Sequence, residues 1–258
     1  MILAIDIGNS NIVIGGYEAE RLMFVTEMVT EYRYTADQYA VSIKSLMGLY
    51  TEKKPFVEGA IISSVVPELV NVIKAAVIRL FGIKPLVVGP GLKTGLPIAI
   101  DNPAQLGADI AACAVAAAAT EPLPCVVYDL GTAATVSVID RAGRLQGVVI
   151  CAGVGTTLEM LTSRTALLPH VSIEAPKTII GKNTMHSMQS GLIYGTAAML
   201  DGLALRIERE LGEPVNLVAT GDMAREIIPH CDRKVKIREH LLLEGLRTIY
   251  YRNKRTKL

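Results

Sequence analysis

One segment of this chain occurs twice, and this internal repeat constrains the fold more than any other feature of the sequence. Its copies lie at the N-terminus and halfway along the chain. Aligned without a gap, they match Asp6 with Asp129 and Gly8 with Gly131, at a constant offset of 123 positions. Each copy is an apolar run, then Asp-x-Gly and a small polar residue, then a second run rich in β-branched residues. This pattern predicts a strand, a tight turn and a returning strand in each half of the chain.

The two Asp-x-Gly turns are candidate phosphate-binding sites. Each places a carboxylate at the end of a buried strand, and glycine lacks the Cβ atom that would keep a phosphate away from the backbone N–H groups. Ser10, Asn11 and Thr132 add hydroxyl and amide donors. One such turn alone is most often an ordinary hairpin. Two of them in duplicated halves would put donors on both sides of one polyphosphate, and would leave Asp6 or Asp129 to hold a divalent metal.

Composition narrows the class of protein. The chain has 258 residues, and the repeat favours two domains, which we expect to span residues 1–118 and 119–258. Half of the residues are hydrophobic, which is enough for a core in each domain. Lys and Arg total 26 against 25 Asp and Glu, so the formal net charge is +1 and gives no electrostatic reason to expect nucleic acid as a partner.

Cysteine usage and hydropathy bear on the cellular compartment. The four cysteines are widely spaced and form no CxxC pair, which is typical of reduced core residues in a cytoplasmic protein. The longest nearly continuous apolar run, residues 110–119, is too short to span a bilayer. We therefore expect a cytoplasmic protein that does not enter the membrane.

The segments outside the repeat also carry helix and strand signals. Apolar periodicity, glycine and proline predict strands over residues 27–34, 59–66, 85–88 and 215–219, and helices over residues 36–49, 156–165 and 180–202. Another helix is predicted from Asn102, a favoured N-cap, through Pro103 at the first helical position to about Ala119.

Asp109 is the only charged residue inside this last predicted helix. The helix is apolar nearly all round and should be buried, where an unpaired carboxylate is costly. Two interpretations stay open: Asp109 acts in chemistry, or it forms a structural ion pair with a buried cation.

The duplicated halves resemble the superfamily of actin, sugar kinases and chaperone ATPases. This resemblance implies an α/β fold of two duplicated ribonuclease H-like domains, each a mixed sheet flanked by helices, with a nucleotide cleft between the domains. Within the superfamily the chain resembles type III pantothenate kinases nearly from end to end. The motifs that carry the resemblance are DIGNSN from Asp6, NPAQLGAD from Asn102, DLGTA from Asp129, RTALLP from Arg164, IGKNTMHSMQSGLIYG from Ile180, TG from Thr220 and LEGLRTIYYRN from Leu243.

The resemblance implies an enzyme that uses ATP to phosphorylate pantothenate to 4'-phosphopantothenate, the first step of coenzyme A biosynthesis. It also implies Mg²⁺, a monovalent cation (K⁺ or NH₄⁺) and a homodimer. Asp109 would be the general base, Asp129 would bind the monovalent cation, and Asp6 would hold Mg²⁺ through the phosphates. ATP would contact Asp6, Ile7, Gly8, Asn9, Ser10, Asn11, Ile12, Val13 and Thr132. The acceptor would contact Ile100, Gly107, Ala108, Ile110 and Thr184.

Three positions depart from the family pattern, and two of them lie on the acceptor side. The family usually has Tyr where Ile100 stands and Arg where Ile110 stands, and a second Gly at Asp222. An Ile cannot make the charge-assisted bond of an Arg to a carboxylate, a loss of roughly 1.5–3 kcal/mol. An alternative is therefore a divergent paralogue that binds nucleotide with little pantothenate kinase activity, as a regulator or as a kinase of another small hydroxyl substrate.

The segment from Ile180 to Leu200 bears on assembly. It combines apolar residues with Gly191 and Gly195, and such a helix offers a flat surface to a partner helix. We expect a homodimer.

Overall fold

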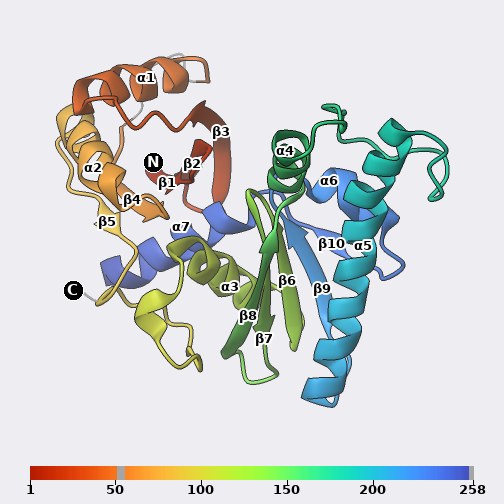
Figure 1. The fold of residues 1–258 in the computed structure, drawn as a ribbon. Helices are drawn as coiled ribbons and strands as arrows, with labels where there is room; N and C mark the ends of the chain where they lie inside the picture. Colours follow the sequence, from red (N-terminus) through yellow and green to blue (C-terminus); the bar gives the residue numbers. More distant parts are fainter. Residues whose placement is uncertain (51–55, 256–258) are drawn as a thin grey trace. The chain divides into compact units, whose positions relative to one another are not determined.

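A computed structural model describes residues 1–50 and 56–255 (Figure 1). The chain forms two compact units. The first unit contains the chain up to Gly95, Asn102–Ala116 and the C-terminal segment from Leu241. The second unit contains Leu96–Asp101 and Ala117–His240.

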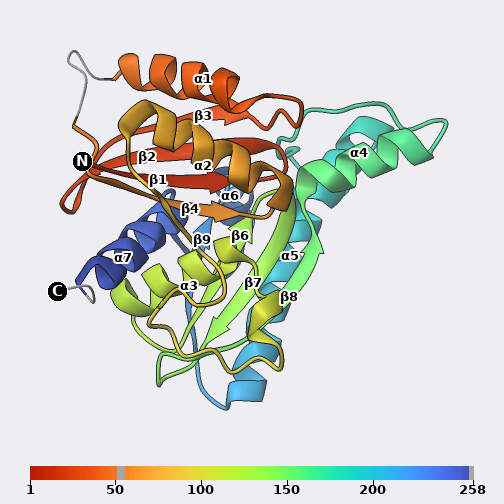
Figure 2. The same cartoon turned by 90° about the vertical axis from the view of Figure 1, so that its left-hand side faces the viewer.

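The first unit is built on a five-stranded mixed sheet in the order β3-β2-β1-β4-β5. Strand β1 pairs antiparallel with β2 and parallel with β4, and β2 pairs antiparallel with β3. Helices α1 and α2 cover one face of this sheet and α7 packs on the other (Figure 2). The elements are β1 (Ile2–Ile7), β2 (Asn11–Glu18), β3 (Arg21–Val29), α1 (Ala36–Gly48), β4 (Gly59–Ser64), α2 (Pro67–Phe81), β5 (Leu86–Val87), η1 (Pro103–Gln105), the first part of α3 (Ala108–Thr120) and α7 (Leu241–Arg255).

The second unit repeats this topology strand for strand. Its sheet has the order β10-β9-β6-β7-β8, in which β6 pairs antiparallel with β7 and parallel with β9. Helices α4, α5 and α6 contribute to the core on one face of the sheet. The elements are β6 (Cys125–Leu130), β7 (Ala133–Ile139), β8 (Leu145–Ala152), α4 (Val154–Arg164), α5 (Thr184–Leu211), β9 (Asn216–Thr220), α6 (Ala224–Ile227), η2 (Ile228–His230) and β10 (Lys236–Ile237). The predicted fold of duplicated mixed sheets with flanking helices is confirmed.

Strand alternation places the acidic residue of the first turn. Leu3, Ile5 and Ile7 belong to the core beneath α1 and α2. Because successive side chains of a strand point to opposite faces, Asp6 faces the other side of the sheet, where α7 packs.

Helix α7 is the last element of the chain, yet it belongs to the first unit. It packs so closely there that a Cβ atom on Gly245 would lie 1.9 Å from the carbonyl oxygen of Ala112. A single division between residues 118 and 119 would instead assign α7 to the second domain, and that division stays a prediction.

Several predicted elements have different bounds in the structure, among them the helix expected over residues 180–202, which is α5, Thr184–Leu211. The helix expected from Asn102 is a single 3-10 turn, η1, after which Leu106 is extended (φ −68°, ψ 127°) and α3 begins at Ala108. Asp109 therefore lies in the first turn of α3 rather than within the body of a longer helix. The strand expected over residues 27–34 is β3, Arg21–Val29, because its bounds follow from pairing with β2.

Candidate functional site

The first turn, residues 8–11, joins β1 to β2 just after Asp6. The Gly8 N–H donates to the Asn11 carbonyl oxygen at 3.0 Å, and a Cβ atom on Gly8 would lie 2.9 Å from that oxygen. A side chain at this position would therefore push the turn apart. Asn9 and Ser10 are exposed at its tip.

Ser63 at the carboxyl end of β4 lies beside Asp6. The two residues are direct partners in the parallel pairing of β1 with β4, so their side chains share one face of the sheet. Ser63 is fully buried, and its Oγ atom has no hydrogen-bond partner in the described part of the chain. Sequence reasoning missed Ser63, although a polar residue ending an apolar strand was the available signal.

The second turn, residues 131–133, joins β6 to β7 just after Asp129. The Gly131 N–H donates to the Ala133 carbonyl oxygen at 3.1 Å, and Thr132 is exposed. Gly221, which follows β9, has a positive φ of 90°, and a Cβ atom on it would lie 2.7 Å from Oδ1 of Asp129. A glycine is needed here both for the backbone conformation and for the carboxylate beside it.

The two turns differ in length. Four residues separate the paired Ile7 and Ile12, whereas three separate the paired Leu130 and Ala134. Strand pairing makes Ile12 equivalent to Ala134, whereas the ungapped alignment of the repeat matches Ile12 with residue 135. The alignment is therefore wrong by one residue in β7.

Two of the residues expected to contact ATP, Ile7 and Ile12, have side chains fully buried in the core of the first unit. If they contribute to binding, they do so through their backbone groups. Asp6 and Val13 are half-buried and lie one position away on the same strands.

Asp109 combines burial with the absence of a cationic partner. Its Oδ1 atom is buried without a hydrogen bond, and the structure gives it no ion pair among residues 1–50 and 56–255. Burial raises the pKa of the Asp109 carboxyl, and the N–H groups of Ile110 and of Asp109 itself oppose this rise. A carboxyl with a raised pKa and no cationic partner is a candidate for a functional group rather than for a structural ion pair.

The predicted acceptor-side residues fall in both units. Ala108 and Ile110 belong to the first turn of α3 in the first unit, Gly107 directly precedes this helix, and the Ile110 side chain is buried. A Cβ atom on Gly107 would lie 2.3 Å from Asp109 Oδ1, so this glycine makes room for the carboxylate. Ile100 and Thr184 belong to the second unit.

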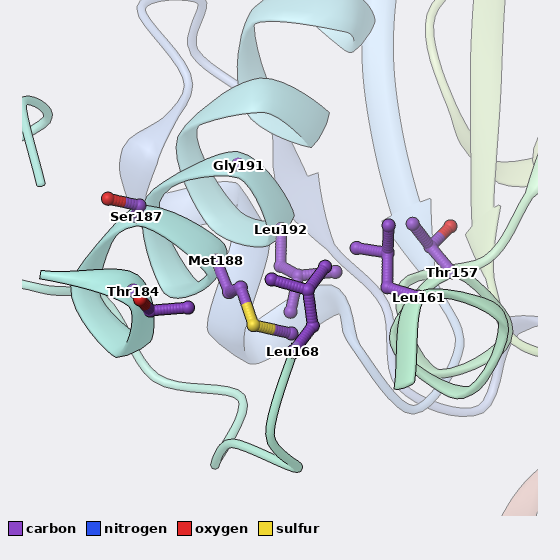
Figure 3. Close-up of a pocket in the computed structure, with 8 residues that line it drawn as sticks. All are labelled: Thr157, Leu161, Leu168, Thr184, Ser187, Met188, Gly191 and Leu192. Atoms are coloured by element: carbon purple, nitrogen blue, oxygen red, sulfur yellow. The ribbon is translucent and has the colours of Figure 1, made fainter. Parts of the chain in front are cut away.

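Thr184 lines an open pocket of about 410 Å³ in the second unit. Leu168, Met188 and Leu192 point toward one another at its centre (Figure 3). Helices α4 and α5 supply seven of the lining residues, and Leu168 comes from the segment between them. The lining residues are Thr157, Leu161, Leu168, Thr184, Ser187, Met188, Gly191 and Leu192.

Two features are absent from residues 1–50 and 56–255. No three His, Cys, Asp or Glu side chains there form a group able to hold a metal ion. No described helix has the length and hydropathy needed to cross a membrane.

The fold matches solved structures along almost the whole chain. A conserved Baf family protein from Campylobacter jejuni covers 98% of this chain and 99% of its own, with a TM-score of 0.61 and 20% identity. The activator of the 2-hydroxyisocaproyl-CoA dehydratase from Clostridium difficile, solved with bound ADPNP, covers 100% of this chain and 97% of its own, with a TM-score of 0.59 and 12% identity. The chain thus shares the fold of these proteins, which is built from two duplicated ribonuclease H-like domains.

Sequence comparison identifies the family. The model of the type III pantothenate kinase family matches residues 2–206. A type III pantothenate kinase from Exiguobacterium sp. strain AT1b is 42% identical over 99% of this chain and 100% of its own length. This chain belongs to the type III pantothenate kinase family.

Proposed function

We propose that this protein transfers the γ-phosphoryl group of ATP to the primary hydroxyl of pantothenate, which gives 4'-phosphopantothenate for coenzyme A biosynthesis. The observation that carries the proposal is full-length similarity to type III pantothenate kinases, together with two acidic glycine turns and an unpaired carboxylate in α3. Phosphoryl transfer depends mainly on positioning and charge stabilisation, and these residues supply both.

Each group has a defined role in this proposal. The turns after Asp6 and Asp129 bind phosphate oxygens through backbone N–H groups and through the side chains of Ser10, Asn11 and Thr132. Asp109 accepts the proton of the attacking hydroxyl, because its raised pKa is closer to neutrality than that of an ordinary carboxyl. Its position in the first turn of α3 places it near backbone N–H groups that orient the carboxylate.

The donor set fits the ions that the family implies. Asp6 and the buried hydroxyl of Ser63 are oxygen donors on one face of the sheet, and Mg²⁺ is commonly held by one or two carboxylates together with substrate phosphates. Asp129, packed against Gly221, is the oxygen donor for K⁺ or NH₄⁺. The ions offset the negative charge of the phosphates, while the chain fixes geometry and holds the proton at Asp109.

A second candidate function follows from the acceptor side. Ile110 is buried and Ile100 is half-buried, so neither supplies a polar group to a carboxylate. A kinase of another small hydroxyl compound, or a nucleotide-binding regulator, would keep the two turns without needing such a group.

One assay separates these functions. Purified protein is incubated with Mg-ATP, KCl and pantothenate, and 4'-phosphopantothenate is detected by mass spectrometry while ADP is measured in parallel. We expect both products in equal amounts. ATP binding without phosphopantothenate at saturating pantothenate would reject the kinase in favour of the regulator, whereas ADP formed only with a different hydroxyl compound would identify another acceptor.

Assembly and location complete the proposal. We propose a homodimer that uses the surface of the second unit around the Thr184 pocket. Leu167, Ile179 and Ile180 are exposed there, and a Cβ atom on Gly191 or Gly195 would meet nothing within 4 Å. Exposed large apolar side chains that gather in one region are common at protein interfaces. Four cysteines without disulfides favour a cytoplasmic location.

A further inference from the structure

Thr30, the residue that follows β3, donates two hydrogen bonds to the first turn. The backbone N–H of Thr30 donates to the Ser10 carbonyl oxygen at 2.8 Å. Its hydroxyl donates to the Gly8 carbonyl oxygen at 2.7 Å. Thr30 is buried, and its two bonds tie two carbonyl groups of the turn to the sheet.

The second turn is held in a similar way from the start of α4. The backbone N–H of Gly153 donates to the Thr132 carbonyl oxygen at 3.1 Å, and the Thr156 hydroxyl donates to the same oxygen at 2.8 Å. A Cβ atom on Gly153 would lie 2.1 Å from the Gly131 carbonyl oxygen. Only glycine permits this approach.

The backbone bond is the same in both halves of the duplication. Thr30 follows Val29, which pairs with Asn11, and Gly153 follows Ala152, which pairs with Ala133. The hydroxyl, however, comes from different places: from the residue that follows β3 in the first unit, and from the first turn of α4 in the second. Two unrelated threonines therefore supply the same kind of bond to a turn carbonyl.

We infer that Thr30 and Thr156 are positioning residues for phosphate binding, an inference that rests on the proposed kinase function. A peptide unit is planar and trans, so a carbonyl group fixed on one side directs the next N–H to the opposite side. Fixing the carbonyl groups of Gly8 and Thr132 therefore directs the N–H groups of Asn9 and Ala133 away from the two threonines, and in this inference phosphate oxygens accept from these N–H groups. The threonines themselves do not touch the nucleotide.

The test compares isosteric and conservative substitutions. Thr30→Val and Thr156→Val remove the hydroxyl but keep the shape, and Thr30→Ser and Thr156→Ser restore it. Thr248→Val is a matched control, because the Thr248 hydroxyl also donates to a carbonyl, that of Glu244, at 2.9 Å, but within α7. The Kd of Mg-ATP is measured by calorimetry, the KM values for ATP and pantothenate by kinetics, and the melting temperature for every variant.

We expect each Val variant to raise the Kd and KM for ATP about three- to tenfold, the effect of one neutral hydrogen bond, with the KM for pantothenate unchanged. The Ser variants should return to the wild-type values and Thr248→Val should not differ from them. Thr156 is at the surface end of a helix, so Thr156→Val keeps the test decisive even where Thr30→Val fails to fold. Val variants that bind ATP like the wild type, or an equal loss in Thr248→Val, would overturn the inference alone. A wild-type protein that does not bind ATP would overturn the proposed function and this inference with it.

Discussion

Ser63 on β4 is the direct parallel partner of Asp6 on β1, and its fully buried hydroxyl has no hydrogen-bond partner in the described part of the chain. A buried, unsatisfied hydroxyl costs about 1–3 kcal/mol of folding free energy. Because the hydroxyl lies beside the carboxylate of the first turn, we expect it to contribute to binding rather than to stability.

Replacing this hydroxyl should separate the two effects. Ser63→Ala should raise the free energy of unfolding by about 1–3 kcal/mol and weaken the binding of Mg-ATP. Urea unfolding and calorimetry measure the two quantities. Ser42→Ala is the control, since Ser42 is exposed on α1 and its hydroxyl bonds to the Gln38 carbonyl. A destabilised Ser63→Ala variant would show that the hydroxyl has a partner in solution and would refute this prediction.

Asp109 gives a prediction that distinguishes catalysis from structure. Asp109→Asn should lower kcat by about 10²–10⁴-fold, the usual contribution of a general base, and leave ATP binding unchanged. A structural ion pair would instead strand a buried cation and cost about 3–5 kcal/mol. Wild-type turnover at an unchanged melting temperature would exclude both roles.

The raised pKa of Asp109 also predicts how stability and activity change with pH. Burial raises the pKa of Asp109 in the folded protein, so folding favours its protonated form. Its contribution to stability is therefore present below the unfolded-state pKa and is lost as pH rises through the folded-state pKa. At neutral pH Asp109→Asn should melt at the same temperature as the wild type or higher, and kcat/KM of the wild type should fall as acid protonates Asp109. Scanning calorimetry and kinetics from pH 5 to 8 check both.

Several parts of the fold and the site were predictable from the sequence, because residues close together in the chain encode them. A strand, an Asp-x-Gly turn and a returning strand are encoded by neighbouring residues, so both hairpins and the duplicated sheets were predicted correctly. The bounds of β3 and the shorter second turn depend on pairing between strands. The early break at Leu106 separates η1 from α3, and the capping signal at Asn102 did not reveal it.

The supports of the two turns were not predictable, because they are contacts between distant residues. Thr30 lies 22 positions from Gly8, and Thr156 lies 24 positions from Thr132. Neither threonine belongs to a motif, and only folding brings them together with the turns.

A substitution at Gly221 tests whether the position of the Asp129 carboxylate depends on this glycine. In Gly221→Ala an unfavourable φ of 90° is combined with Cβ contacts of 2.5 Å to the Leu130 backbone nitrogen and 2.7 Å to Asp129 Oδ1. In Gly82→Ala the φ is 70° and the Cβ atom meets nothing within 4 Å. Gly82→Ala should lower the free energy of unfolding by somewhat more than about 0.4–1 kcal/mol, through backbone strain alone. Gly221→Ala should cost more than this and should weaken activation by K⁺, measured as the KCl concentration at half-maximal rate. Equal stability losses and normal activation would show that Asp129 does not depend on this glycine.

The ion pair of Glu208 with Arg233 predicts acid sensitivity in the second unit. Oε1 of Glu208 lies 2.6 Å from Arg233, and this hydrogen bond lowers the pKa of the carboxyl. Its contribution to stability is present above the unfolded-state pKa of about 4.3 and is lost as pH falls through the lower folded-state pKa. Glu208→Gln should flatten the fall of the melting temperature below pH 5, whereas Glu210→Gln, at an exposed position on the same helix, should leave it unchanged.

The proposed homodimer is tested at Ile180, which is 75% exposed just before α5. A carboxylate placed in an apolar interface without a partner loses its hydration, so Ile180→Glu should shift sedimentation from a dimer to a monomer at micromolar concentration. Val41→Glu is the matched control, because Val41 is 65% exposed on α1 in the other unit. Both variants should keep the wild-type circular dichroism, since neither side chain is buried within the chain. A wild-type protein that sediments only at its monomer mass of 27.7 kDa would refute the dimer, and a dimeric Ile180→Glu variant would place the interface elsewhere.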